Sequence, residues 1–228
     1  MTRAFRTSFP EIEAYMRSCM SDSAHDAEHV YRVLNYALDI ARHEGGADTE
    51  RLAAACLLHD IGRREQFADP GVDHAICGAE KARNWLVGNG YSTGFADAVK
   101  SCIETHRFRS CSPPQSLEAK ILFDADKLDV CGAVGVARTL FYKAHVAEPL
   151  YSMTEGGKVG DGADGEEPSF MQEYKFKLEN VYGNFYTKRG EQLAAKRRDA
   201  ARHFYDSLLA ELRECFEGGA LVIEENIL

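Results

Sequence analysis

The chain has 228 residues, of which 45% are hydrophobic and 28% charged, with a formal net charge of -9. This composition is that of an ordinary soluble globular protein. The acidic balance argues against stable nucleic-acid or anionic-membrane binding, because both need a basic surface. A small phosphorylated substrate stays compatible with it, since a bound divalent ion can reverse the local field.

The seven cysteines contain no CxxC pair, and no stretch of about 18 apolar residues occurs. The N-terminus also lacks an apolar signal core. We therefore expect a cytoplasmic protein with reduced thiols and no membrane span.

Apolar residues at helical spacing predict an all-α fold. The first predicted helix places Ile12 and Met16 on one face after Pro10, and Asp48 or Thr49 caps the third. In chain order, the predicted helices cover residues 9–20, 26–43, 48–60, 73–88, 94–106, 116–129, 133–146, 169–188 and 190–216.

A loop rich in glycine and acidic residues, TEGGKVGDGADGEEP, covers residues 154–168. It has almost no side chain to bury, so we predict that it is mobile. We expect one all-α domain over residues 1–228, in which the C-terminal helices within 169–216 pack on the first seven.

An adjacent histidine and aspartate, His59 and Asp60, stand at the end of an apolar helix in the string LLHDIG. They can converge on one ion that lies beside the helix end. A neutral imidazole and a carboxylate suit Zn, Mn, Fe or Ni. The competing interpretation is an aspartate that hydrogen-bonds a turn.

His25 and His29 are four residues apart and share one helix face. Val30 and Val33 form the neighbouring apolar stripe, which puts His29 at the edge of the buried face. A ligand there would point inward. The alternative is a solvated histidine pair near a helix start.

Three carboxylates, of Asp124, Asp126 and Asp129, interrupt an otherwise apolar helix. Charge at such a place is costly unless it is paired, hydrogen-bonded or bound to a metal. An ion pair with an arginine is the competing interpretation for Asp126.

The strings HDAEHVYRV, LLHDIG and DADKLD, followed by GAVGVARTL, together resemble the HD-domain superfamily of metal-dependent phosphohydrolases. The similarity runs over about residues 25–145. The later segment EYKFKLENVYGNFYTKRGEQLAAKRR also looks like bacterial HD proteins that hydrolyse nucleotides. The resemblance implies an HD-domain helical bundle with two additional C-terminal helices.

The resemblance implies four metal ligands, namely His29, His59, Asp60 and Asp126. Asp124 is the rival for the last place, and Asp126 is preferred because it directly precedes the Lys-Leu of the family pattern.

A second metal would use His74 and His106, because two-metal members of the superfamily have two extra histidines in this interval and an aspartate that bridges both ions. In this chain the bridging residue would be Asp60. Otherwise these histidines bind substrate phosphate or cap helices.

A divalent ion makes hydroxide available near neutral pH and polarises a phosphoryl oxygen. Asp60 belongs to this catalytic centre, and the candidates for a general acid or base are Glu65, His106 and Asp129. Cations for the substrate phosphate are offered by Arg63 or Arg64, Arg107, Lys127 and Arg138.

We therefore expect a metal-dependent phosphohydrolase that cleaves a phosphate ester or diphosphate of a small molecule, with a nucleotide as the expected substrate. The ion would be Mn, Fe, Co, Ni, Mg or Zn, in one or two copies. Two alternatives stay open: an inactive HD protein that binds a nucleotide or partner, and a di-iron oxygenase on the same scaffold. The sequence leaves the oligomeric state open.

Overall fold

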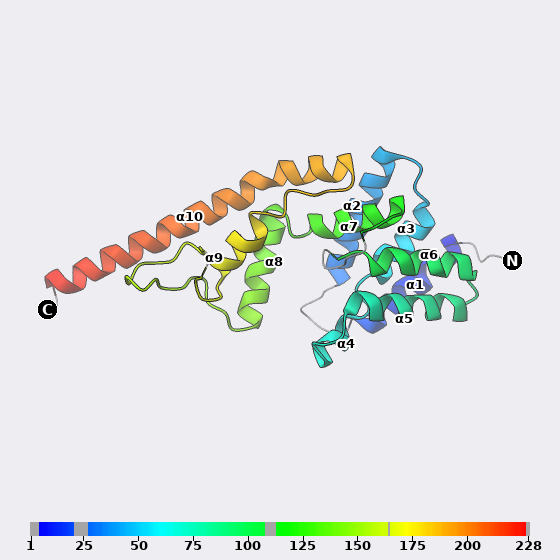
Figure 1. Ribbon diagram of the computed structural model, residues 1–228, viewed down its shortest axis with the longest axis horizontal. Coiled ribbons are helices and arrows are strands. Elements are labelled where there is room, and N and C mark those ends of the chain that lie inside the picture. The colour runs from blue at the N-terminus through cyan, green and yellow to red at the C-terminus, as the bar shows by residue number, and fades with distance from the viewer. Residues whose placement is uncertain (1–4, 21–26, 108–112, 164, 227–228) are drawn as a thin grey trace. The chain divides into compact units, whose positions relative to one another are not determined.

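The computed structural model describes residues 5–20, 27–107, 113–163 and 165–226, and its regular structure is helical (Figure 1). Within these ranges there is no β-strand, and an isolated bridge joins Met153 to Val159. The all-α prediction is confirmed. No helix in this part of the chain is both long enough and apolar enough to cross a membrane.

The chain divides into two compact units. The first consists of Met1–Asp129 and Phe185–Glu191, and the second of Val130–Asn184 and Gln192–Leu228. This division does not test the prediction of a single domain over residues 1–228, because a compact unit is not necessarily a domain that folds alone. The single domain stays a prediction.

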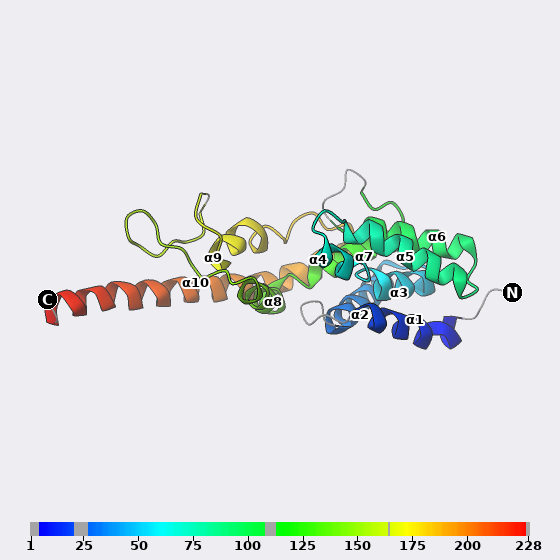
Figure 2. The ribbon, with the colours of Figure 1, turned by 90° about the horizontal axis from the view of Figure 1, so that it is seen from below.

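The first unit is a bundle of short helices around a buried central one (Figures 1 and 2). Its helices are α1 (Phe5–Cys19), α2 (Ala27–Glu44), α3 (Thr49–Leu58), α4 (Arg63–Ala68), α5 (His74–Gly88), α6 (Thr93–Glu104) and α7 (Leu117–Leu128).

The central helix is α3, which contacts α1, α2, α5, α6 and α7. Every side chain from Leu52 to Leu58 is buried, as expected for a helix that is apolar on all sides. Asp48 caps α3, because its carboxylate accepts a hydrogen bond from the Arg51 backbone N–H. The end of α3 therefore lies inside the bundle, and the HD pair follows directly.

A short helix that the sequence did not predict, α4, begins directly after the HD pair. Gly62 precedes it and lies against α5: a Cβ on Gly62 would stand 2.3 Å from the His74 carbonyl oxygen. Only glycine permits this approach. The chain thus turns back at once and brings α5 close to the end of α3.

The Asp124 carboxylate fastens residues 185–191 to α7. It accepts hydrogen bonds from the backbone N–H groups of Tyr186 at 3.0 Å and Thr187 at 2.7 Å. The Thr187 hydroxyl donates a third, at 2.6 Å. A Cβ on Gly190 would lie 2.8 Å from Asp124 Oδ2, so this position also needs glycine.

The second unit contains α8 (Gly132–His145), α9 (Phe170–Glu173), the π-helical turn η1 (Tyr174–Leu178) and most of α10 (Lys188–Asn226). Its core includes Phe170 and Met171, and the rings of Tyr174 and Tyr205 stack at 4.2 Å between centroids. These contacts join α9 and η1 to α10.

The predicted helix over 169–188 is correct only as far as Leu178, and the predicted helix over 190–216 extends from Lys188 to Asn226. Asn184 adopts a left-handed conformation with φ of 59°, which a helix cannot continue through. The backbone N–H groups of Tyr186 and Thr187 then serve Asp124 instead of a helix ladder.

The acidic, glycine-rich segment 154–168 is organised in part by the Glu166 carboxylate. This group accepts hydrogen bonds from the Ser152 hydroxyl at 2.9 Å and from the Gly162 backbone N–H at 3.0 Å. The mobility of the segment stays a prediction.

We expect Asp124→Ala to lower the free energy of unfolding by more than about 2 kcal/mol, because it leaves the buried hydrogen-bond donors of Tyr186 and Thr187 without their acceptor. Thr187→Val removes only the hydroxyl, and should lower it by about 1 kcal/mol. Urea unfolding measures both. Equal losses in the two variants would contradict this role for Asp124.

Candidate functional site

Three groups from separate helices converge in the first unit. His29 lies on α2, His59 directly follows α3, and Asp126 lies on α7. His29 Nε2 stands 3.3 Å from both His59 Nε2 and Asp126 Oδ1, and His59 Nε2 stands 3.9 Å from Asp126 Oδ1. We call these residues the first cluster.

The Asp60 carboxylate adjoins the first cluster through Oδ2. This oxygen lies 3.6 Å from His29 Nε2 and 3.7 Å from His59 Nε2. Donor atoms that each stand about 2.1 Å from one tetrahedral ion are separated by roughly 3.4 Å. The pairs measured here therefore have distances close to those within a coordination shell.

A second cluster gathers at the other oxygen of the same carboxylate. Asp60 Oδ1 lies 3.4 Å from His74 Nε2 on α5 and 3.7 Å from Nε2 of His106, which follows α6. These three residues are the second cluster, and each cluster can hold a metal ion by its geometry. Asp60 is thus shared between both clusters.

Each of the four histidines makes a hydrogen bond through Nδ1. Two of the acceptors are backbone carbonyls: Cys56 O lies 2.7 Å from His59 Nδ1, and Ile103 O lies 2.6 Å from His106 Nδ1. A carbonyl only accepts, so Nδ1 carries the proton and the Nε2 lone pair faces Asp60.

For the other two histidines, side-chain oxygens accept the hydrogen bond from Nδ1. Asp129 Oδ2 lies 2.7 Å from His29 Nδ1, and Gln66 Oε1 lies 2.7 Å from His74 Nδ1. Histidines that bind metals are usually oriented in this way.

Three polar atoms of this region are buried without a hydrogen-bond partner among the described residues. They are Asp60 Oδ2, His74 Nε2 and His106 Nε2. Such atoms are costly unless a further group, such as a cation or a water, satisfies them. Asp60 Oδ2 faces His29 and His59, so this oxygen fits a divalent ion at the first cluster, whereas the two histidine nitrogens fit either an ion or a hydrogen-bond donor.

Burial lowers the pKa of His59 to about 4, and burial together with the Arg63 charge lowers the pKa of His74 to about 2. Both imidazoles are neutral at pH 7, which is the form that binds metals. Burial raises the pKa of Asp60, but Arg63 and His59 outweigh it and hold this pKa well below its ordinary value.

Asp124 and Asp126 differ in what their carboxylates contact. Asp126 reaches the first cluster, whereas Asp124 binds the backbone of Tyr186 and Thr187. Burial raises the pKa of Asp124, against the hydrogen bonds from Thr187 and Tyr186 that lower it. His25 lies outside the described residues.

Two of the three acid–base candidates are engaged elsewhere. Glu65 Oε1 lies 2.7 Å from Lys81 Nζ, and Asp129 accepts from Arg32 Nε at 2.8 Å. Neither residue is a member of a cluster found among the described residues. His106 belongs to the second cluster.

The four predicted phosphate-binding cations differ in position. Arg63 Nε donates to Asp60 Oδ1 at 2.9 Å, and Arg107 approaches Asp73 at 3.4 Å. Lys127 Nζ lies 4.7 Å from the ring centroid of Phe185. Arg138 lies on α8, in the second unit, and its role stays a prediction.

The sequence did not point to Gln66, the partner of His74. It lies on α4, which the sequence also left unpredicted, and a glutamine near an HD pair carries no signal of its own.

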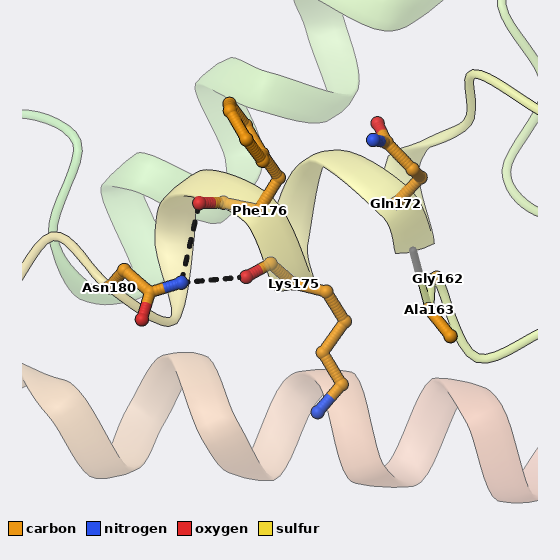
Figure 3. A pocket seen from close by; sticks show the side chains of 6 residues that line it. All are labelled: Gly162, Ala163, Gln172, Lys175, Phe176 and Asn180. Atoms are coloured by element: carbon orange, nitrogen blue, oxygen red, sulfur yellow. Dashed lines mark hydrogen bonds between the residues drawn. The ribbon is translucent and has the colours of Figure 1, made fainter. Parts of the chain in front are cut away.

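A pocket in the second unit contains no site residue; Lys175 and Phe176 of η1 line it (Figure 3).

Comparison with known proteins finds similar chains. A model of the family described as HD domain matches residues 26–131. The Bacillus subtilis (strain 168) protein YpgQ is 28% identical over 205 residues, which cover 87% of this chain and 90% of YpgQ.

Two solved structures are similar along nearly the whole chain. A predicted HD superfamily hydrolase from an uncultured Thermotogales bacterium is 30% identical, with a TM-score of 0.61, covering 90% of this chain and 92% of that one. YpgQ in complex with ADP is 25% identical, with a TM-score of 0.71, covering 91% of this chain and 96% of that one.

We expect Gly62→Ala to destabilise the protein by about 1–3 kcal/mol, because its methyl group would meet the backbone of α5 at 2.3 Å. The matched control is Gly94→Ala on α6, whose methyl group would meet no atom within 4 Å. Thermal unfolding compares them. A Gly62→Ala protein as stable as the control would contradict the close packing.

Proposed function

The chain belongs to the HD superfamily, and we propose that it is a divalent-metal-dependent phosphohydrolase acting on a small phosphorylated molecule, with a nucleotide as substrate. The observation that carries the proposal is the first cluster together with the adjoining carboxylate of Asp60. His29, His59, Asp60 and Asp126 present two imidazole nitrogens and two carboxylate oxygens at 3.3–3.9 Å in most pairs.

In this proposal those four residues hold the ion. When bound, it supplies Lewis acidity and an activated water. Asp129 and the Cys56 carbonyl fix the imidazole rings of His29 and His59, so that both Nε2 lone pairs face one point. The chain thereby orients the ligands before the ion arrives.

Asp126 has a side chain that is 25% exposed, whereas those of His29, His59 and Asp60 are at most 2% exposed. Solvent reaches the Asp126 side chain, and in this proposal the substrate approaches from that side. Open coordination positions are what a catalytic site requires.

His106 is the best-placed proton acceptor of the three candidates. Asp129 is held by Arg32 and His29, and Glu65 is held by Lys81. His106 Nε2 carries a lone pair beside Asp60. We propose that this atom accepts a proton from the attacking water or relays it.

The nucleotide part of the proposal is supported by the relative YpgQ, whose solved structure contains ADP. Arg63 adds a positive charge next to Asp60, which suits an anionic substrate. The proposal covers phosphate esters and diphosphates alike.

The di-iron alternative depends on the second cluster, because it needs two ions that share Asp60. Two irons per chain in protein purified from iron-containing medium would favour it. Bound metal without turnover across a panel of phosphate compounds would instead favour an inactive binding protein.

We expect the His59→Ala variant to lose its metal and to release phosphate or pyrophosphate more than about 100-fold more slowly. Removing a direct metal ligand lowers affinity and activity more than removing an outer-shell hydrogen-bond partner does. Elemental analysis and a release assay over nucleotides measure this. His43→Ala is the control, since His43 is exposed and bonds only to Asp39 among the described residues. Full activity in metal-free His59→Ala protein would overturn the proposal.

We expect Asp129→Asn to weaken metal binding by about 10- to 100-fold, because the amide orients His29 less firmly and removes the adjacent negative charge. Competition with a fluorescent chelator measures the affinity. Asp97→Asn is the control, since Asp97 pairs with Arg83 at the surface. Unchanged affinity in Asp129→Asn protein would show that Asp129 does not support the site.

A further inference from the structure

The Arg63 guanidinium lies against the Asp60 oxygen that belongs to the second cluster. Arg63 is the first residue of α4, and its Nε donates to Asp60 Oδ1 at 2.9 Å. The same oxygen is the one that faces Nε2 of His74 and His106. An ion in the second cluster and the arginine would therefore share one carboxylate oxygen.

Arg63 is held there by the chain itself. Gly62 packs against α5, and α4 starts at the next residue, so the arginine follows the HD pair after a single tight turn. Its side chain is only 26% exposed, and the side chain of Asp60 is 1% exposed. A charge-assisted contact in such a place is a strong one.

The charges of the region favour one ion over two. Asp60 and Asp126 carry two negative charges, and Arg32 neutralises Asp129. One divalent ion balances the two carboxylates, and Arg63 leaves a surplus of one positive charge. A second divalent ion would raise this surplus to three, close to the guanidinium and shielded from water.

We propose that Arg63 takes the place of a second divalent ion at Asp60, so that the centre holds one ion and a fixed guanidinium. This inference rests on the proposed function. Arg63 is then a positioning residue: it keeps Asp60 directed at the first cluster. It also leaves the lone pairs of His74 and His106 as hydrogen-bond acceptors.

The test is the number of Mn²⁺ ions per chain. The wild-type protein is saturated with Mn²⁺, passed through a desalting column and analysed for metal and protein. We expect one ion. We expect two in Arg63→Leu, together with the electron paramagnetic resonance signal of a spin-coupled manganese pair.

Two further variants locate the effect. Arg63→Lys keeps the charge and should hold one ion. Arg63→Leu combined with His106→Ala should return to one ion, because the second cluster has lost a ligand. If Arg63→Leu does not fold by circular dichroism, Arg63→Gln, which also removes the charge, is used in its place.

The outcomes separate this inference from the function on which it rests. Two ions in the wild-type protein, or one ion in the folded variant without the Arg63 charge, would overturn the role of Arg63 and leave the phosphohydrolase proposal intact. A wild-type protein that binds no ion would overturn the proposed function itself.

Discussion

The buried carboxylate of Asp60 is the constraint on which the rest of the first unit depends. A charge with a side chain only 1% exposed is costly unless other groups compensate it. Its two oxygens face different partners, His29 and His59 on one side, and His74, His106 and Arg63 on the other. Helices α2 to α6 are arranged so that each of these groups lies in the first turn of a helix or just beyond the end of one.

The residues of the candidate site have unusual chemistry for their positions, but each alone was a modest signal, and the resemblance to the HD superfamily supplied the set of four. Polar and charged groups at the end of one apolar helix and within another are costly to bury unless they are paired, hydrogen-bonded or bound to an ion. The structure brings four of them together: His29, His59, Asp60 and Asp126. Apart from α4, the helices of the first unit were predictable for a related reason: each has an apolar face, and α3 is apolar all round.

The choice between Asp124 and Asp126 shows where local pattern stops being sufficient. Two residues apart on a helix, these carboxylates point to nearly opposite sides. What separates them is Thr187, which follows about sixty residues later and donates to Asp124. The same contact accounts for the last residues of the wrongly predicted helix over 169–188, because Asp124 accepts the backbone N–H groups of Tyr186 and Thr187. Long-range hydrogen bonds of this kind leave no periodic trace in the sequence.

The histidines and aspartates of a metal centre do not by themselves determine how many ions it holds. Here the second cluster has three atoms that could hold a second ion. Its histidines are oriented by Gln66 and Ile103, just as those of the first cluster are oriented by Asp129 and Cys56. The difference is the cation that already lies against Asp60 Oδ1. Since a guanidinium stays charged at any pH at which the protein is folded, the positive charge of Arg63 beside Asp60 is permanent. In the proposed centre, Arg63 would thus bear on the ion count as directly as the ligands do.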